Sequence, residues 1–513
     1  MGTSLLYNSM APMKSPPNLN HVPEGYLTPL ERDGKKRGIF LNIFIVAFLL
    51  VCSYSFLQLA NSTAIILGLG IIGVWRHGWG IINFARAVHY KSLASRQHKT
   101  QITTDGSLVV VVTFYNQNKE EVTAVTKALA DAVFELPIPI YLICAHRTDD
   151  QRSIFEREFK SRRNTALNFC RQNGLGKREA LADCLTIAKS SYFPKTREKS
   201  CVLLIDGDTI VTQDAIEQSI AHLQQDRHLG AVVVNEIPFS KGSQLFNQWR
   251  MLRSLERNKL MCSFALSGRV LVLTGRFCMY RGDIILQNDV INRLRKDFIR
   301  IKDMHISLLT GDDKTTWLEV IRRKKLMRYL PYSYIFPIEA PNLTNGFVRC
   351  TYRLTNRYSG NMARANLHKD AWIGVKHTHH FAFGLLDQRI SMWTGLLTPL
   401  TLLYLLLFNH FGIFIVVLTY TLLIKHVQAL ALWLLSGKYD PWYPYLIFYN
   451  QVLSSLIKVR AFAYLHRQSW TNQEISTDEN TYTLILDRKA RSNLILRTLI
   501  FLSLFTLLYF LLR

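Results

Sequence analysis

The chain is short of acidic side chains and of paired cysteines. Among its 513 residues, 37 Asp and Glu stand against 62 Lys and Arg, a formal net charge of +25. No compact basic-aromatic motif accompanies this charge, so we expect no nucleic-acid partner. The eight cysteines form no Cys-x-x-Cys pair and have no matching histidine spacing, so we expect reduced thiols and no zinc. The positive charge instead favours anionic lipid, a nucleotide diphosphate or an acidic polymer.

The sequence also lacks an internal repeat and an N-terminal apolar signal, since its first apolar run starts only near residue 38. Uncharged apolar runs then occupy residues 38–60, the shorter 61–75, and 393–424, which is too long for one helix and has a hairpin turn at Asn409. Further apolar runs cover 442–457 and 494–512. Lysines and arginines flank the first two runs, so the positive-inside rule places residues 76 to about 385 in the cytoplasm.

Between the apolar runs, strand and helix patterns alternate. All-apolar or nearly apolar strands are predicted at 108–113, 138–144, 202–205 and 230–234, with helices at 120–134 and 177–190. This alternation predicts a doubly wound α/β nucleotide-binding domain. The predicted order is a mobile cytoplasmic tail (1–34), two transmembrane helices (35–75), a cytoplasmic domain with interfacial helices (76–385), transmembrane helices (386–465), a cytoplasmic segment (466–493) and a final transmembrane helix (494–513).

Two acidic pairs mark the predicted chemistry of this domain. Asp206 and Asp208 follow a buried strand, where an Asp-x-Asp sequence presents hard oxygen ligands to Mg²⁺ or Mn²⁺ beside a diphosphate. Taken alone they are also ordinary turn residues. Asp312 and Asp313 precede a helical pattern, where they suit an N-cap pair, a role that is compatible with catalysis. We select Asp313 as the base, with Asp312 as its neighbour or an acceptor contact.

Basic residues supply two more candidate contacts. Lys177 and Arg178 open a helix after a glycine-rich turn, which suits phosphate, although the P-loop spacing is absent and a solvated helix start is the simpler alternative. Arg357, followed by Tyr358, suits a leaving diphosphate through bidentate hydrogen bonds. The alternative for Arg357 is ordinary positive charge on an interfacial helix.

These blocks, in this order and between membrane helices, resemble the processive family-2 glycosyltransferases, which include cellulose, chitin and hyaluronan synthases. Within them, the chain looks like the polymerising subunits of bacterial alginate synthases, over residues 70 to 475. The matching segments are GVWRHGWG (73–80), GKREALA (176–182), LLIDGDT (203–209), MCSFALSGRVLVLTGRFCMYR (261–281), LTGDDKTTW (309–317), LDQRISMWTGLL (386–397) and YNQVLSSLIKVRAFAYLHRQSWTNQ (449–473).

The resemblance implies a GT-A type nucleotide-sugar-binding domain inserted between N- and C-terminal transmembrane helices, in a multi-pass protein of the bacterial inner membrane. It implies an inverting, metal-dependent transfer from GDP-mannuronate to a β-1,4 polymer that leaves through the C-terminal helices. A membrane copolymerase subunit that binds cyclic diguanylate is the implied partner. The implied roles are metal and donor binding for Asp206 and Asp208, donor binding for Lys177 and Arg357, catalysis for Asp313 and Asp312, acceptor binding for Thr274, Gly275, Arg276 and Tyr358, and gating for Ser469, Trp470 and Thr471.

The chain departs from the wider family at three places. The Gln-x-x-Arg-Trp motif becomes Leu354-Thr-Asn-Arg357-Tyr358, an aspartate expected after the first strand is absent, and Glu179 lies in the helix-opening block. Asp149 or Asp150 is the alternative contact for the nucleotide base. The remaining alternatives are another donor such as a UDP-sugar, a single transfer to a lipid acceptor, and a non-enzymatic transporter or scaffold. The last is disfavoured because the apolar runs carry almost no acidic residues.

Overall fold

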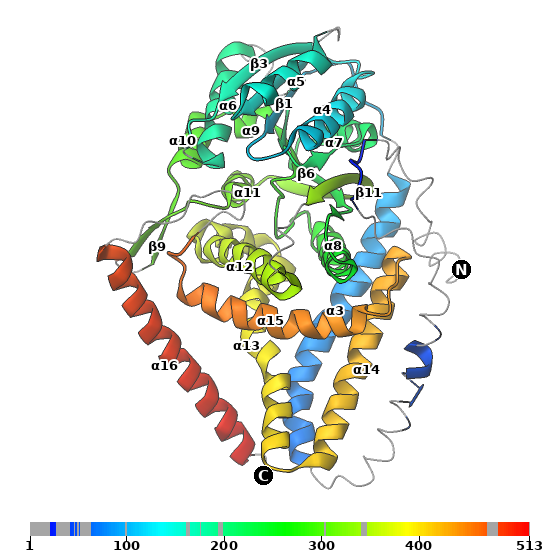
Figure 1. The fold of residues 1–513 in the computed structure, drawn as a ribbon, viewed down its shortest axis with the longest axis vertical. Coiled ribbons are helices and arrows are strands. Elements are labelled where there is room, and N and C mark those ends of the chain that lie inside the picture. Colours follow the sequence, from blue (N-terminus) through cyan, green and yellow to red (C-terminus); the bar gives the residue numbers. More distant parts are fainter. Residues whose placement is uncertain are drawn as a thin grey trace.

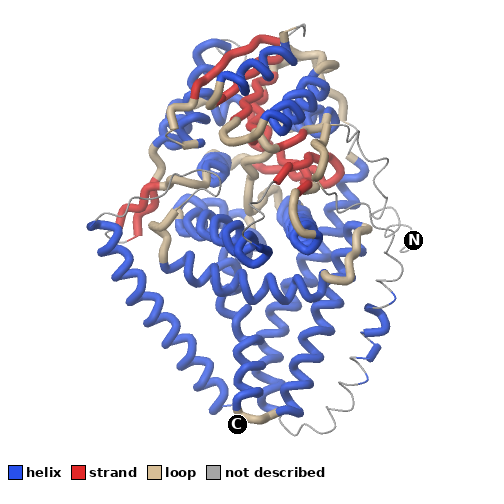
Figure 2. The backbone as a smooth tube through the Cα atoms, viewed as in Figure 1, coloured by secondary structure: helices blue, strands red, loops and turns tan. Residues whose placement is uncertain are grey.

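The computed structural model describes residues 21–26, 63–97, 100–160, 165–174, 176–192, 199–301, 304–339, 346–468 and 481–511, with isolated positions between 40 and 51. Over these residues an α/β domain occupies one end of the molecule, and long helices extend from it to the other end (Figure 1). The tube in Figure 2 shows that the strands are confined to the α/β end and to one hairpin beside it.

One mixed sheet of nine strands forms the centre of the domain. Its strands are β1 Leu108–Thr113, β2 Ile140–His146, β3 Thr165–Arg171, β4 Cys201–Asp206, β5 Thr209–Ile210, β6 Leu229–Glu236, β7 Phe239–Ser240, β8 Phe277–Arg281 and β11 Leu326–Glu339. The order is β3-β2-β1-β4-β8-β6-β11-β5, with β7 paired to β11. Strands β3, β2, β1 and β4 are parallel, while β8 runs antiparallel to both β4 and β6. The sheet is therefore the doubly wound type that the sequence predicts, with an inserted antiparallel strand.

Helices cover both faces of this sheet. They are α4 Lys119–Val133, α5 Asp149–Phe159, α6 Lys177–Tyr192, α7 Gln213–Gln225, α8 Gln244–Ala265, α9 Gly282–Ile285, α10 Asn288–Arg295 and α11 Asp312–Arg322. Successive side chains of a strand point to opposite faces. Accordingly, Val110 and Val112 of β1 join a core with α4, α5 and α7, whereas Val109 and Val111 join a second core with α6 and α11. An all-apolar strand such as β1 is thus explained by burial on both sides.

The predicted elements are confirmed with small shifts in their bounds. The first strand lies at the predicted residues, the first helix begins one residue earlier, and β2 lies two residues later than predicted. The elements that were not predicted include the strands β3, β8 and β11, which carry polar or aromatic residues among their apolar ones. A separate hairpin of β9 (Phe298–Ile301) and β10 (Met304–Ser307) was also missed.

Long helices lead away from the sheet. They are α3 Thr63–Arg96, α12 Gly346–Leu367, η2 Lys369–His377, α13 His379–Leu407, α14 Phe411–Ser436, α15 Tyr443–Ala463 and α16 Thr481–Leu511. Figure 1 shows α3, α13 and α14 running alongside one another down the long axis, with α15 crossing them near the α/β domain. Among the described residues, α13 and α14 are the helices long and apolar enough to cross a membrane.

The predicted hairpin between these two helices is confirmed. Asn409 has a φ of 58°, a left-handed conformation that asparagine tolerates better than most residues, and it lies between the end of α13 and the start of α14. The run 442–457 instead lies in α15, which contains Asn450, Gln451 and Lys458. The run 38–60 lies mostly outside the described residues, and the side chains of α16 are described only to Ser503.

The second predicted apolar run is part of a longer element than expected. Helix α3 continues from Thr63 past the apolar run to Arg96, so residues 76–96, which were expected to begin the cytoplasmic domain, belong to the same helix. Its polar side chains find partners inside the protein: Asn83 accepts a hydrogen bond from Ser263 at 2.7 Å, and Lys91 donates one to the Leu435 carbonyl at 2.6 Å. These contacts explain why the helix does not end at the edge of the apolar run.

A short piece of the expected N-terminal tail is packed against the domain. His21 lies 3.1 Å from Asp131 of α4, the Tyr26 hydroxyl donates a hydrogen bond to Glu121, and Tyr26 is buried in the core beneath α4. The Lys241 ammonium lies over the Tyr26 ring at 4.7 Å. Residues 21–26 therefore form a structural part of the α/β domain.

Candidate active site

The first acidic pair lies at the carboxyl edge of the parallel strands. Asp206 is the last residue of β4 and pairs in register with Thr113, the last residue of β1. Two residues later, the Asp208 carbonyl accepts a hydrogen bond of 2.7 Å from the Ile338 N–H of β11. Both aspartates are thus fixed by the sheet at the edge where open α/β sheets bind ligands.

The second acidic pair forms the first turn of α11. The N-cap is Gly311, whose φ of 87° is a left-handed conformation that glycine adopts without steric cost, and no side chain caps this helix. The interpretation of Asp312 and Asp313 as an N-cap pair is therefore wrong, since they occupy the two positions after the cap. Carboxylates in a first helical turn are stabilised by the helix dipole, which favours their charged form at this place.

Lys177 joins the two acidic pairs. It is the first residue of α6, and its ammonium forms an ion pair with Asp206 and lies 2.9 Å from Asp312 Oδ2. All three side chains are largely shielded, with exposed fractions of 13% for Lys177, 27% for Asp206 and 7% for Asp312. Water therefore screens these charges weakly, and the cation holds together two carboxylates that are remote in sequence.

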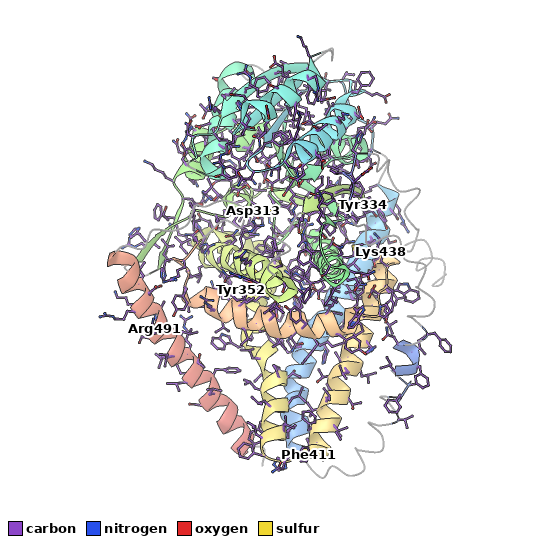
Figure 3. All side chains as sticks on the ribbon, in the orientation of Figure 1. Asp313, Tyr334, Tyr352, Phe411, Lys438 and Arg491 are labelled. Carbon is purple, nitrogen blue, oxygen red and sulfur yellow. The ribbon has the colours of Figure 1, made fainter. Side chains whose placement is uncertain are left out.

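Six of the predicted site residues line one cavity around this cluster. They are Lys177, Asp206, Thr274, Gly275, Asp312 and Asp313. The remaining wall comes from Leu181, Leu204, Ile205, Tyr280 and Thr316. Figure 3 shows Asp313 between the α/β domain and the layer of α12 and α15. Asp313 thus lies near the helices that lead to the apolar end of the molecule.

Burial and mutual repulsion set the ionisation of the carboxylates. Burial, with the neighbouring Asp206 charge, raises the pKa of Asp208 to about 6. Burial also raises the pKa of Asp313, helped by the Asp312 charge, although Lys314, 3.8 Å away, counteracts it. For Asp312, burial alone would raise the pKa, but the Lys177 ammonium brings it below its ordinary value. Asp312 is therefore the charged partner of Lys177, and Asp313 is the better proton acceptor.

Arg276 lies outside this cavity, in an ion-pair cluster behind it. It lies 3.1 Å from Glu236 and also pairs with Glu339, while Arg257 and Arg250 are further partners of these glutamates. Arg276 Nη2 and Arg357 Nη2 each donate to the Tyr358 hydroxyl at 3.4 Å. Although burial opposes it, the arginines lower the pKa of Tyr358. Arg276, Arg357 and Tyr358 thus form one group beside the cavity.

Arg178 differs in role from its neighbour Lys177. Its guanidinium donates hydrogen bonds to the Leu294 carbonyl at 2.9 Å and to the Thr315 hydroxyl at 2.9 Å, and it lies 3.6 Å from Asp297. These contacts tie α6 to α10 and α11. The expectation that both basic residues face a phosphate is therefore wrong for Arg178, which fixes the helices that carry Lys177 and Asp312.

A polar network that the sequence did not reveal supports the turn before α11. The Gln468 amide oxygen accepts from the Leu309 and Thr310 N–H groups at 3.0 and 3.3 Å, and Arg364 Nη2 lies 3.0 Å from the Thr310 hydroxyl. No local motif predicts contacts between residues this far apart. The predicted gating residues Ser469, Trp470 and Thr471 begin immediately after Gln468, and they lie outside the described residues.

Asp206 and Asp208 are the residues that suit a divalent cation. Both carboxylates are partly buried, their pKa values are raised by burial and by neighbouring carboxylate charge, and a cation between them would relieve that repulsion. Among the described residues, no group of three or more His, Cys, Asp and Glu side chains is arranged to hold a metal. The donor set therefore fits a hard cation that shares its coordination with a ligand such as a diphosphate.

The mixed sheet with helices on both faces is the GT-A-like fold of glycosyltransferases. The family model described as glycosyltransferase like family 2 matches residues 106–369, about half of the chain. The chain belongs to this family.

Curated relatives narrow the comparison. The chain is 29% identical over 428 residues to glycosyltransferase alg8 of Pseudomonas syringae pv. tomato, which covers 81% of this chain and 85% of the relative. It is 28% identical over 425 residues to glycosyltransferase alg8 of Azotobacter vinelandii, with the same coverage. Among solved structures, the mannosyltransferase PcManGT from Pyrobaculum calidifontis in complex with GDP-Man and Mn²⁺ is 13% identical, with a TM-score of 0.42, covering 76% of this chain and 96% of that one.

Proposed function

We propose that the protein is a processive, inverting glycosyltransferase that polymerises mannuronate from GDP-mannuronate into a β-1,4-linked precursor of alginate. The observation that carries this proposal is the Lys177 cluster, which brings the strand-end carboxylate Asp206 to the helix-start carboxylates Asp312 and Asp313 in one cavity. This arrangement can hold a diphosphate on one side and a base on the other. The similarity to the two alg8 glycosyltransferases supports the choice of polymer.

On the donor side, Lys177 would bind the diphosphate, because its ammonium is already held at the cavity wall by two carboxylates. Asp206 and Asp208 would hold Mg²⁺ or Mn²⁺, which supplies positive charge for the leaving diphosphate. Arg357, beside Tyr358, lies in the basic group next to the cavity and would complete the charge around the donor. Asp149 or Asp150, both exposed in the first turn of α5, stays the proposed contact for the nucleotide base.

On the acceptor side, Asp313 would remove the proton from the attacking hydroxyl. Its raised pKa makes it a stronger base than an ordinary aspartate, and its position in the first turn of α11 keeps it fixed. Attack from the side opposite the leaving diphosphate inverts the sugar carbon. Thr274 and Gly275 line the same cavity and would position the acceptor sugar.

The remaining features of the proposal concern the membrane. Helices α13 and α14 would span the bacterial inner membrane with the α/β domain on the cytoplasmic side, and the polymer would leave through the C-terminal helices. Ser469, Trp470 and Thr471 would close over the donor. A membrane copolymerase that binds cyclic diguanylate would activate the enzyme. The alternatives are another donor, such as a UDP-sugar, and a single transfer to a lipid acceptor.

Donor turnover by purified membranes that contain the full chain tests this proposal. We expect long polymer from GDP-mannuronate with Mg²⁺ or Mn²⁺, and none from GDP-mannose, UDP-glucose, UDP-glucuronate or UDP-N-acetylglucosamine. The assay is run with and without the partner subunit and cyclic diguanylate. Polymer from a UDP-sugar would overturn the donor, and a single added sugar would overturn processivity.

Replacing Gly275 with alanine should lower donor turnover about tenfold or more, which corresponds to about 1.4 kcal/mol or more of lost transition-state binding. A Cβ at this position would lie 3.0 Å from Lys177 Nζ and 3.5 Å from Asp312 Oδ2, so the ammonium would have to move. Steady-state kinetics and the melting temperature in detergent are measured together. Gly412→Ala is the matched control, because a Cβ there meets no atom within 4 Å. Unchanged turnover in Gly275→Ala would contradict the assigned role of the cavity.

A further inference from the structure

The membrane-proximal half of the molecule carries a strong excess of positive charge. Between residues 346 and 468 the acidic residues are Asp370, Asp387 and Asp440, and the same stretch holds twelve lysines and arginines. Asp370 pairs with Arg322 of α11, which lies outside this stretch. The acidic residues of this stretch are therefore too few to balance the charge of its lysines and arginines.

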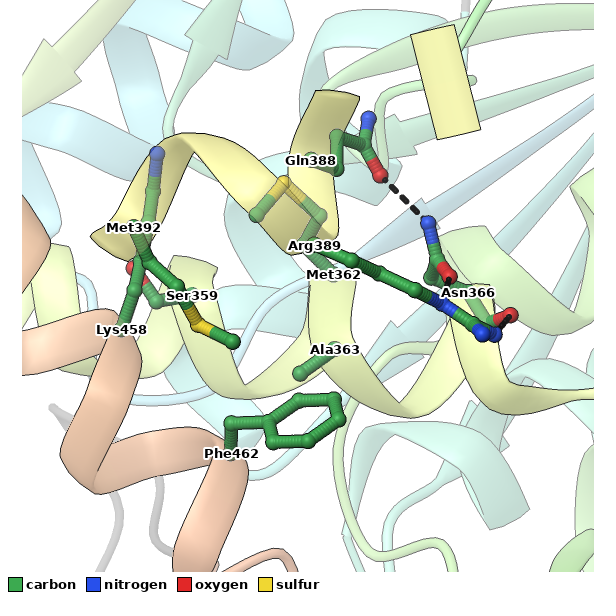
Figure 4. Close-up of a pocket in the computed structure, with 9 residues that line it drawn as sticks. All are labelled: Ser359, Met362, Ala363, Asn366, Gln388, Arg389, Met392, Lys458 and Phe462. Atoms are coloured by element: carbon green, nitrogen blue, oxygen red, sulfur yellow. Dashed lines mark hydrogen bonds between the residues drawn. The ribbon is translucent and has the colours of Figure 1, made fainter. Parts of the chain in front are cut away.

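A cavity between α12, α13 and α15 collects two of these cations. It is lined by Ser359, Met362, Asn366, Gln388, Arg389, Met392, Lys458 and Phe462, with Ala363 beside them (Figure 4). No carboxylate is part of this lining. The cavity has about 20 Å³ of space for water-sized groups, which is enough for a carboxylate group in place of a water molecule.

Lys458 faces this cavity instead of the outside of α15. The outward positions of that helix include Leu456, which is 54% exposed, and Arg460, which is exposed and contacts Tyr352. Lys458 itself is partly buried, and among the described residues no carboxylate lies within ion-pair distance of it. Burying an ammonium in this way is costly unless an anion compensates it.

The charges around Lys458 do not supply that compensation. The charged groups that act on it most strongly include Arg253, Arg76, Asp387 and Glu256, two of each sign, so these four charges do not together neutralise the ammonium. Arg389 adds a second positive charge. Its guanidinium donates to the Asn366 side-chain and main-chain oxygens at 2.5 and 3.0 Å and lies over the Trp372 ring at 4.8 Å. These neutral partners orient Arg389 without neutralising it.

The cavity also lies close to the proposed reaction site. Ser359 and Asn366 lie on α12, the helix that carries Arg357 and Tyr358 beside the catalytic cavity. Gln388 and Met392 lie on α13, which leads to the apolar end of the molecule. Methionine and phenylalanine side chains beside two cations suit a sugar ring with a carboxylate substituent, since one face is apolar and the edge is charged.

We propose that Lys458 and Arg389 form a carboxylate-binding subsite for the growing polymer, so that this cavity accepts acidic sugar residues and disfavours neutral ones. The inference rests on the proposed polymerase function and names a place on the exit side where the acidity of the product is recognised.

The test compares Lys458→Gln with the charge-retaining Lys458→Arg in the full-length protein in membranes. Lys369→Gln is the control, because it removes one positive charge from an exposed position of the same region. We expect Lys458→Gln to shorten the product several-fold on a gel and to leave the initial rate of nucleotide release within about twofold of the parent. Lys458→Arg and Lys369→Gln should give the parental product length. Parental product length in Lys458→Gln would overturn the proposal.

A binding measurement distinguishes a failure of this subsite proposal from a failure of the proposed function. The detergent-solubilised protein is titrated with a short fluorescent oligomannuronate and with its carboxyl-reduced, neutral counterpart. We expect Lys458→Gln to weaken the acidic probe about tenfold, the loss of one charge-assisted contact, and to leave the neutral probe unchanged. If the parent turns over no donor, the proposed function fails while this binding result still decides the subsite. An equal effect on both probes would overturn the subsite.

A lipid headgroup offers the same anionic chemistry as the polymer, and the same variants can distinguish the two ligands. Nucleotide release and product length are compared in nanodiscs of phosphatidylcholine alone and of phosphatidylcholine with phosphatidylglycerol. We expect the difference between the parent and Lys458→Gln to persist in both. A difference that appears only with phosphatidylglycerol would assign the cation to lipid and overturn the polymer subsite.

Discussion

Replacing Asp313 with asparagine should abolish polymer formation, with donor turnover falling by about three orders of magnitude, within the range that a positioned base contributes. Asparagine keeps the shape of the side chain and its place in the first turn of α11, so the protein should stay folded and in the membrane. The measurement is nucleotide release and polymer yield in membranes that contain equal amounts of each variant.

The neighbouring position supplies the contrast. Asp312→Asn removes the charged partner of Lys177 and should weaken donor binding as well as turnover, so the Michaelis constant for the donor should rise. Asp313→Asn should change mainly the maximal rate. Because burial raises the pKa of Asp313, the acid limb of the parent's pH–rate profile should lie above the pH at which an ordinary aspartate titrates. Normal polymer yield from Asp313→Asn would contradict its role as the base.

The second large effect is expected at Lys177. Replacing it with glutamine leaves Asp206 and Asp312 buried without their common cation, and breaking a buried ion pair in this way costs about 3–5 kcal/mol of folding stability. Donor turnover should fall at least about a hundredfold, because the diphosphate loses its fixed ammonium. Thermal unfolding in detergent and donor kinetics measure the two effects separately.

The stability loss at Lys177 should depend on pH in a defined direction. In the parent, Lys177 holds the pKa of Asp312 below its unfolded value, against the effect of burial. A group with a depressed folded pKa stabilises the protein above its unfolded pKa, about 3.9 for aspartate, and this stability is lost as the pH falls. The difference between the parent and Lys177→Gln should therefore be largest near neutral pH and should shrink below about pH 4. A difference independent of pH would mean that the ion pair is not its cause.

Lys189→Gln is a suitable control for the Lys177 experiment. Lys189 lies on the same helix, α6, at a partly exposed position where its ammonium contacts the Asn288 side chain. Surface substitutions of this kind usually change stability by less than about 0.5 kcal/mol. If Lys189→Gln reproduced the loss seen for Lys177→Gln, the effect would belong to the helix and not to the acidic cluster.

The sequence predicted the parts of the fold that are encoded locally. Strand β1 is recognisable because six successive residues are buried on both faces, and α6 is recognisable from its glycine-rich start. Strand β11 was missed because its fourteen residues include two prolines and four tyrosines or phenylalanines in a mixed burial pattern. Its place is decided by pairing with β6, β5 and β7, which are remote in sequence.

The same distinction holds for the site. Asp206, Asp208, Asp312 and Asp313 stand out because acidic pairs interrupt apolar or helical patterns at element ends. The bridging contact of Lys177, the turn of Arg178 toward Asp297 and the support of Thr310 by Gln468 are tertiary contacts. No spacing in the sequence distinguishes Lys177 from Arg178, although one lines the cavity and the other ties helices together.

The unbroken helix α3 has a mechanical consequence. It is 34 residues long, or about 50 Å at 1.5 Å per residue, and it is anchored to α8 through Ser263 and to the end of α14 through Lys91. Arg76 of the same helix also donates a hydrogen bond to the Thr394 hydroxyl of α13 at 3.4 Å, so α3 contacts both the helix α8 of the α/β domain and the long helix α13. If the protein extends a polymer as proposed, we therefore expect that the α/β domain does not rock toward these helices when the polymer advances by one sugar. In that case, the polymer would advance through smaller movements of loops or side chains near the site while α3 keeps its place.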